Sequence, residues 1–161
     1  MVTIRPLNDN DFDTVDVIQH LAYPPGLAET QEVLKSKRRA APDFCFLACA
    51  NGAAVGYVIA HPWLRDKSPG LERSIDVLPP ECDVVHLHDL VVHPDSHGQG
   101  IARALVDAVV QHAMDAAFDE ITLVAVMDAQ SFWQKMGFQT VRSVQGYDDH
   151  AVFMRRVLRA R

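Results

Sequence analysis

The chain has 161 residues, 48% of them hydrophobic and 22% charged, which suits one domain with a sizeable core. Its net charge of −6 argues against nucleic acid as a partner, and no apolar run is long enough to predict a membrane span. The three cysteines, Cys45, Cys49 and Cys82, have neither metal-site nor redox-motif spacing, so we expect a reducing, cytoplasmic location.

The first half of the chain alternates strand-like and helix-like segments. Residues 2–7 are predicted to form a strand, and Asn8 or Asp9 caps a predicted helix that runs to about Ala22. A second helix is predicted over residues 28–41, and its basic end, residues 35–39, is interpreted as a solvated face rather than a phosphate site. Strands follow over 44–50 and 53–60, joined by Asn51-Gly52, which is typical of a two-residue hairpin turn.

A long segment rich in proline and charge, residues 62–83, has no clear periodicity and is typical of a functional or mobile loop. The pattern then predicts a strand over 84–92, a helix over 100–117, a buried strand over 121–126, a short helix over 129–136, and a strand pair over 138–144 and 151–157. The chain therefore predicts a single α/β (α+β) domain over residues 1–161, with a mixed sheet flanked by helices.

A loop of small residues, His97-Gly98-Gln99-Gly100-Ile101-Ala102, links the strand over 84–92 to the following helix. Gly98 and Gly100 let the backbone approach a ligand closely, and the first amides of the helix have no partner within it. The helix dipole adds partial positive charge at the same place. This arrangement predicts that the loop binds a pyrophosphate.

The order of the elements, together with this loop, resembles the GNAT superfamily of acyl-CoA-dependent N-acetyltransferases. Gly100 and Ala102 match the family's phosphate loop, whose first position holds His97 here instead of Arg or Gln. The stretch Ala129-Gln130-Ser131-Phe132-Trp133-Gln134-Lys135-Met136-Gly137-Phe138 is similar to the family's Ala-x-x-Phe-Tyr-x-x-x-Gly-Phe ending. The resemblance implies that acetyl-CoA is the cosubstrate and that its site comprises Leu90, Val91, Val92, His97, Gly98, Gln99, Gly100, Ile101, Ala102, Arg103, Ser131 and Trp133.

A narrower resemblance lies in the strand His86-Leu87-His88-Asp89-Leu90-Val91-Val92-His93, which is similar to that of arylalkylamine N-acetyltransferases. In that family two alternate histidines relay a proton from the substrate amine, and His86 and His88 match them. Histidine titrates near neutrality, as this task requires, and alternation puts both side chains on one face. Alternation also puts Asp89 on the opposite face, although a bulge, usual in the family, would shift the register. A backbone N–H between Leu90 and Val92 is expected to stabilise the oxyanion.

Trp133 stands where the family commonly has a tyrosine that protonates the departing thiolate. Tyr147, in the loop between the last two strands, is the candidate replacement, with water as the alternative. Tyr23 and Trp63 are candidates for binding the apolar part of a substrate, and Glu29 for binding an ammonium group, although each also suits an ordinary surface loop.

These residues together predict acetylation of a small aryl- or alkylamine by a monomer or homodimer. Acetylation of a protein N-terminus, a lysine or a polyamine is an alternative, and so is a non-catalytic acyl-CoA-binding module. No metal is predicted, because the phosphate loop already explains two of the four histidines that could form a metal site, which are His86, His88, His93 and His97.

Overall fold

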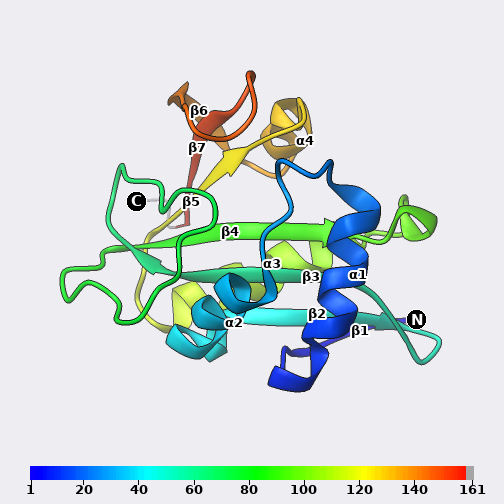
Figure 1. Ribbon diagram of the computed structural model, residues 1–161. Helices are drawn as coiled ribbons and strands as arrows, with labels where there is room; N and C mark the ends of the chain where they lie inside the picture. Colours follow the sequence, from blue (N-terminus) through cyan, green and yellow to red (C-terminus); the bar gives the residue numbers. More distant parts are fainter. Residues whose placement is uncertain (159–161) are drawn as a thin grey trace.

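Within residues 1–158, seven strands form one mixed sheet in the order β1-β2-β3-β4-β5-β7-β6 (Figure 1). Their bounds are β1 Val2–Pro6, β2 Cys45–Ala50, β3 Ala53–Trp63, β4 Val84–Val92, β5 Glu120–Ala125, β6 Gln139–Ser143 and β7 Val152–Val157. β4 and β5 run parallel, and the other neighbouring strands run antiparallel. This computed structural model describes residues 1–158; positions 159–161 of the predicted domain lie outside the described residues.

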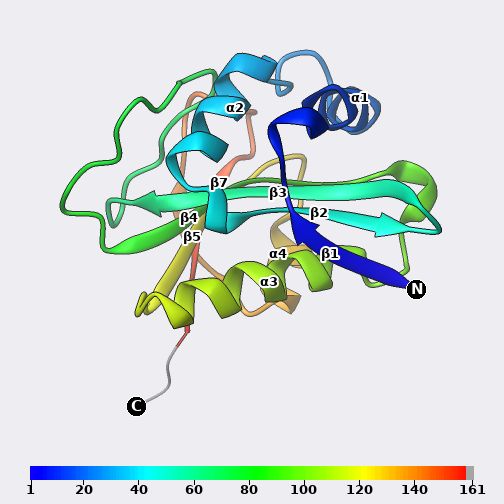
Figure 2. The ribbon, with the colours of Figure 1, turned by 90° about the horizontal axis from the view of Figure 1, so that it is seen from below.

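Helices cover both faces of the sheet. α1 (Phe12–Ala22) and α2 (Gln31–Ala40) lie on one face, and α3 (Ile101–Asp115) and α4 (Gln130–Lys135) lie on the other (Figure 2). Each face has its own apolar core: Phe12, Ile18, Leu34, Tyr57 and Ile59 pack under α1 and α2, and Val58, Leu87, Leu105, Val109 and Phe138 pack on the α3 side. Within residues 1–158, no helix combines the length and the apolar content that crossing a membrane requires.

The predicted α/β class and the order of helices and strands are confirmed, with small changes in bounds. β3 extends to Trp63, because residues 61–63 pair with the start of β4, so the long loop spans residues 64–83. α2 begins at Gln31 instead of residue 28. The hairpin turn is confirmed: Asn51 and Gly52 have φ angles of 54° and 80°, the positive values that a type I′ turn requires.

The prediction of a solvated basic face over residues 35–39 is wrong for Lys37. The side chain of Lys37 is completely buried, and its Nζ donates a hydrogen bond to the carbonyl oxygen of Arg73. The loop 64–83 folds back over α2 and excludes water from this position. A run of basic residues does not reveal in advance which of its members such a distant loop will cover.

β4 carries a bulge at His88. Ile59 and Ala60 are adjacent in β3, but they pair with Asp89 and Leu87, so His88 is the extra residue on β4. The bulge places Asp89 on the α1 face, where it meets Tyr23 and Tyr57. The expectation from strict alternation that Asp89 faces the other side is therefore wrong.

β4 and β5 separate soon after they meet. They pair only from Val85 with Ile121 to Leu87 with Leu123, and beyond this point the two strands diverge (Figure 1). The rest of β4, from His88 to Val92, keeps β3 on one side and has lost its neighbour on the other. This free edge is where the candidate site is built.

Candidate active site

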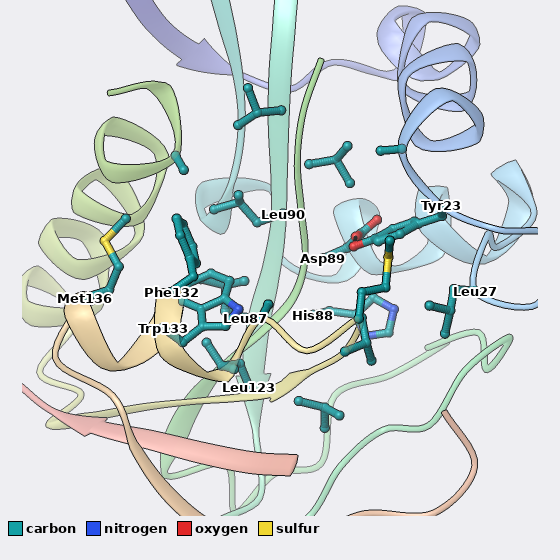
Figure 3. A pocket seen from close by; sticks show the side chains of 18 of the residues that line it. Tyr23, Leu27, Leu87, His88, Asp89, Leu90, Leu123, Phe132, Trp133 and Met136 are labelled. Atoms are coloured by element: carbon teal, nitrogen blue, oxygen red, sulfur yellow. Dashed lines mark hydrogen bonds between the residues drawn. The ribbon is translucent and has the colours of Figure 1, made fainter. Parts of the chain in front are cut away.

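A cleft of about 680 Å³ opens where β4 and β5 diverge (Figure 3). Figure 3 shows Phe132, Trp133 and Met136 on one side of it and Tyr23, His88 and Asp89 on the other. Leu87, Leu90 and Leu123 lie between the two groups. The cleft thus has an apolar middle and one apolar side, and the polar groups labelled in Figure 3 gather on the side of Tyr23, His88 and Asp89.

One end of the cleft is the loop before α3. Gly98 and Gly100 have φ angles of 81° and 75°, and Gly100 immediately precedes the first residue of α3. A Cβ built on either glycine would meet no protein atom within 4 Å, so space for a ligand lies beside this backbone. The free amides at the start of α3 and the positive end of its dipole suit a phosphate group there. The residues present therefore fit the pyrophosphate of acetyl-CoA.

The free edge of β4 supplies further donors. The backbone N–H of His93 donates to the carbonyl of Val55 in β3. Because successive amides of a strand point to opposite sides, the N–H groups of Val92 and Leu90 point away from β3, toward the cleft. These two amides can bind an acyl oxygen or the amide groups of an extended ligand.

Most of the predicted cofactor residues line this cleft. They are Leu90, Val91, Val92, His97, Gly98, Gly100, Ile101, Ala102, Arg103 and Trp133. Gln99 and Ser131 are not among the lining residues, whereas Phe132, beside Ser131, is. Trp133 also belongs to the core, where its ring packs edge-on against Phe138 with centroids 5.4 Å apart. The ring nitrogen Nε2 of His97 lies 3.3 Å from the carbonyl oxygen of Val92.

The other end of the cleft holds a group of buried polar side chains. His88 Nε2 and Glu29 Oε1 lie 2.5 Å apart, and their side chains are 2% and 5% exposed. Asp89 accepts hydrogen bonds of 2.7 Å from the hydroxyls of Tyr23 and Tyr57, one on each carboxylate oxygen. Burial raises the pKa of Asp89 despite the nearby His88 and the two tyrosine hydroxyls. Burial acts in the same direction on Glu29, but His88, the backbone N–H of Glu72 and the charge of Lys37 together outweigh it and lower the pKa of Glu29.

His86 lies behind His88 and does not line the cleft. Its Nδ1 is 2.9 Å from Thr122 Oγ1, and its ring centroid is 6.3 Å from that of His88. Complete burial holds the pKa of His86 well below its ordinary value, so the ring is neutral at neutral pH. The structure thus keeps the two predicted histidines on one face but brings only His88 to the cleft.

Trp63 also lies outside the cleft lining and packs edge-on against His61, with centroids 5.2 Å apart. His61 Nε2 and Trp63 Nε1 are buried and have no hydrogen-bond partner among the described residues. A buried water commonly satisfies such groups, since an unpaired buried polar atom is costly.

A short piece of the long loop connects two walls of the polar end. We call residues 68–72 the bridging segment. At one end, Ser68 Oγ lies 2.5 Å from the hydroxyl of Tyr147, which also accepts a 3.1 Å hydrogen bond from the N–H of Gly70. At the other end, Glu72 donates its N–H to Glu29 Oε2 over 2.8 Å and accepts a 2.6 Å hydrogen bond from the N–H of Thr30.

Two residues that line the cleft lie where the bridging segment meets the polar end. Leu71 of the bridging segment lines the cleft, and so does Tyr147, from the loop between β6 and β7. Burial raises the pKa of Tyr147, which keeps its hydroxyl protonated at neutral pH. Sequence reasoning identified Tyr147 but not Leu71, Leu27 or Asp89, which lie beside the predicted residues at this end. The only sequence signal for Asp89 was its position next to His88 in a strand where a bulge was expected.

Across residues 1–158, no three histidine, cysteine, aspartate or glutamate side chains come together as a group that could hold a metal ion. His93 and His97 lie at the phosphate end of the cleft region, where His93 Nδ1 accepts a 3.1 Å hydrogen bond from the N–H of Asp95. They are therefore separated from the pair formed by His88 and Glu29.

Comparison with known proteins assigns this chain to one family. A sequence model of the Acetyltransferase (GNAT) family matches residues 12–138. N-acetyltransferase family 8 member 2 of Rattus norvegicus is 32% identical over 115 residues, which cover 70% of this chain and 45% of the relative. An uncharacterized N-acetyltransferase, ycf52 of Pyropia yezoensis, is 38% identical over 50 residues, covering 31% of this chain and 29% of the relative. The matches thus span less than half the length of these curated relatives.

Solved structures share the fold of this chain. Ard1 from Thermoplasma volcanium superposes with a TM-score of 0.81 at 18% identity, covering 99% of both chains. Naa50 of Arabidopsis thaliana, solved with the bisubstrate analogue CoA-Ac-MVNAL, has a TM-score of 0.73 at 17% identity, covering 96% of this chain and 97% of that one. The chain belongs to the Acetyltransferase (GNAT) family.

Proposed function

We propose that this protein transfers the acetyl group of acetyl-CoA to a small primary amine, which attacks the thioester directly. The observation that carries this proposal is the course of β4. Its free edge runs from the phosphate-binding loop to His88, so one strand joins a CoA-binding end to an end that can accept a proton. A cytoplasmic location, where the three free cysteines would stay reduced, is part of the proposal.

The cofactor is held chiefly by backbone groups in this proposal. The amides of residues 98 and 100–103 bind the pyrophosphate, and the side chain of His97 borders it. The amides of Leu90 and Val92 bind the rest of the molecule, while Phe132 and Trp133 pack against its apolar arm. When bound, acetyl-CoA supplies an acetyl group activated as a thioester.

His88 is the group that we assign to proton removal. An alkylamine is an ammonium ion at neutral pH and must lose a proton before its nitrogen can attack. His88 lines the cleft, and its imidazole can accept that proton. His86, on the same face, is assigned the second position in the proton path, so its replacement should cost less activity than that of His88.

The acyl oxygen and the leaving thiolate need separate groups. We assign the acyl oxygen to the amide of Leu90 or Val92, since preformed donors stabilise charge that develops during the reaction. Tyr147 is the candidate acid for the thiolate, because it borders the cleft and stays protonated. A thiolate also leaves readily without full protonation, so loss of Tyr147 should slow the reaction without abolishing it.

The bridging segment supports a small acceptor rather than a polypeptide. A polypeptide must lay several residues beyond its reacting amine along a groove. Here residues 68–72 run from Tyr147 to Glu29 and Thr30, across the space between the two loops that wall the polar end. The side chains that remain for an acceptor body are largely apolar: Leu27, Leu71, Tyr23 and Tyr147. An amine with an apolar aryl or alkyl portion suits this space.

A panel of acceptors tests the proposal. Thiol release from acetyl-CoA is followed with arylalkylamines, alkylamines, a polyamine, and peptides bearing a free N-terminus or a lysine. We expect turnover with amines that carry an apolar body and much slower turnover with peptides. Faster acetylation of a peptide than of every small amine would contradict the small-acceptor proposal, and binding without turnover of any amine would favour a non-catalytic acyl-CoA-binding module.

A matched pair of variants tests the bridging segment itself. Ser68→Ala removes its side-chain contact with Tyr147, whereas Ser74→Ala changes an exposed serine of the same loop. We expect Ser68→Ala to raise peptide acetylation relative to amine acetylation and Ser74→Ala to leave the ratio unchanged. The same ratio in both variants would remove the support that the segment gives to a small acceptor.

A further inference from the structure

Each carboxylate oxygen of Glu29 has a polar partner. Oε1 faces His88 Nε2 at 2.5 Å, and Oε2 accepts a 2.8 Å hydrogen bond from the N–H of Glu72. The side chain is only 5% exposed, and the His88 side chain is 2% exposed. Glu29 therefore meets His88 in a nearly dry environment, at one wall of the cleft.

The backbone of Glu29 is held as firmly as its side chain. Gln19 of α1, which is completely buried, donates from its amide nitrogen to the Glu29 carbonyl over 2.5 Å. Its amide oxygen accepts the Glu29 N–H over 3.1 Å. One side chain thus satisfies both backbone groups of Glu29 and fixes the position from which the carboxylate reaches His88.

This contact determines which nitrogen of His88 carries the proton. An ionised carboxylate only accepts hydrogen bonds, so the facing nitrogen, Nε2, must be the donor. A neutral imidazole with its proton on Nε2 has its lone pair on Nδ1. The ring has no second hydrogen-bond partner among residues 1–158, which leaves Nδ1 available to another molecule.

We propose that Glu29 is a positioning residue that orients His88 and fixes its proton on Nε2, so that Nδ1 is the base for the amine. This inference rests on the proposed function, and it replaces the task of holding the ammonium group directly. The carboxylate also stabilises the imidazolium that forms when Nδ1 takes the proton from the amine. The amine nitrogen then attacks the thioester carbon with its free electron pair, the C–S bond breaks, and the second proton of the nitrogen goes to the departing thiolate.

Several titratable groups surround this pair and bear on its pH dependence. They are Lys37 from α2, Tyr57 and His61 from β3, His86 and Asp89 from β4, Tyr23 from the end of α1, Glu72 from the bridging segment, and Tyr147 from the loop between β6 and β7. Burial lowers the pKa of Lys37, although Glu29, Glu72 and Asp89 oppose this shift. Because these neighbours are the same in every variant of residue 29, comparing such variants isolates the contribution of the carboxylate.

Glu29→Gln is the decisive substitution. The Glu72 N–H still needs an acceptor, so the glutamine must keep its oxygen there and turn its NH₂ group toward His88. His88 Nε2 then becomes an acceptor, and the proton moves to Nδ1, the nitrogen that should receive the amine proton. With an alkylamine at about pH 7, we expect kcat to fall about 100-fold with little change in KM, as for loss of a well-placed general base.

Two features of that loss separate positioning from a structural role. It should shrink as the pH approaches the pKa of an alkylammonium ion, about 10.4, where no base is needed. It should also nearly vanish with an aromatic amine, which is already neutral at about pH 7. Glu32→Gln, which changes an exposed carboxylate of α2, is the matched control and should behave as wild type.

The relative kcat values of two replacements at residue 29 give a second test of the positioning role. Glu29→Asp shortens the side chain but keeps an acceptor-only carboxylate, whereas Glu29→Gln keeps the shape and loses that property. We expect Asp to retain more kcat than Gln. In a His88→Gln background, either change at residue 29 should have almost no further effect, because Glu29 acts through His88.

Nitrogen NMR of the His88 ring decides the inference even if no amine proves to be a substrate. We expect a protonated Nε2 in the wild type and a protonated Nδ1 in Glu29→Gln. An unchanged tautomer would overturn the positioning role, and so would an equal loss of kcat at every pH and on both amines. A raised KM with unchanged kcat would identify Glu29 as an ammonium ligand instead. Absence of turnover by the wild type, with the expected tautomers, would count only against the proposed function.

Discussion

His88 and Asp89 are adjacent in β4, yet both direct their side chains to the α1 face of the sheet. The bulge at His88 causes this arrangement, because it adds one residue between the partners of Ile59 and Ala60. His88 reaches Glu29, and Asp89 reaches Tyr23, so two consecutive residues contact both ends of the segment that follows α1. The bulge therefore brings an imidazole and a buried carboxylate to the same wall of the cleft.

Asp89→Ala should destabilise the fold, because it leaves the hydroxyls of Tyr23 and Tyr57 without their acceptor. We expect a loss of about 2–4 kcal/mol in the free energy of unfolding, since each unpaired buried hydroxyl is costly. Asp89→Asn keeps one acceptor oxygen and should lose less. Urea unfolding measures both variants, with the exposed Asp76→Ala as a control. Wild-type stability of Asp89→Ala would show that these hydrogen bonds contribute nothing net.

Gly56→Ala should affect stability and cofactor binding together. A Cβ at residue 56 would lie 2.9 Å from the carbonyl oxygen of Val91 and 3.3 Å from Cγ2 of Ile101. β4 and the start of α3 must both move away from residue 56 to admit the methyl group. Both of them border the cleft, so the cofactor site changes as well. We expect a loss of about 2 kcal/mol in unfolding free energy and weaker acetyl-CoA binding by calorimetry. Gly26→Ala, whose Cβ would meet nothing within 4 Å, is the control that should change neither quantity.

His97→Arg should strengthen acetyl-CoA binding. His97 borders the loop that fits a pyrophosphate, and an arginine there adds a permanent positive charge. At this exposed position we expect the Kd to fall about five-fold at low salt and the gain to fade as salt rises. His20→Arg adds the same charge on α1, and it should leave the Kd unchanged. An equal gain in both variants would point to a general effect of net charge.

The parts of the fold and site that could be predicted are those that depend on residues close together in the sequence. β4 has the predicted bounds because its apolar run lies between a long polar loop and Pro94, and the loop before α3 shows its two glycines directly. His88, Glu29 and Tyr147 were predicted individually. Which of them would contact one another was not predictable, because the contacts span the whole sheet.

The unpredicted features depend on contacts between residues far apart in the chain. Lys37 lies in a run of basic residues that looks exposed, but it is buried and its Nζ donates to the carbonyl of Arg73, 36 positions later. The bridging segment likewise depends on Tyr147, 79 positions after Ser68. Such hydrogen bonds leave no periodic pattern in the sequence, so the closed polar end of the cleft became visible only in three dimensions.

The buried histidines should make the protein lose stability in acid. Burial lowers the pKa of His61 from 6.5 to about 3, although a hydrogen bond with the Pro62 carbonyl opposes the shift. Burial also holds the pKa of His86 well below its ordinary value. Below pH 6.5 the unfolded chain binds a proton at His61, whereas the folded protein binds that proton only near pH 3. The stabilising contribution is therefore complete above pH 6.5 and is lost as the pH falls toward 3.

His61→Gln isolates one of these protons. Between about pH 6 and pH 4, the unfolding free energy of the wild type should fall more steeply than that of the variant, by about 1.4 kcal/mol per pH unit. Urea unfolding at several pH values gives both slopes, and the difference removes the contribution of the carboxylates common to the two proteins. His20→Gln replaces an exposed histidine of α1 and should keep the wild-type slope. Parallel curves for His61→Gln and the wild type would mean that His61 takes up its proton in the folded state, which its complete burial opposes.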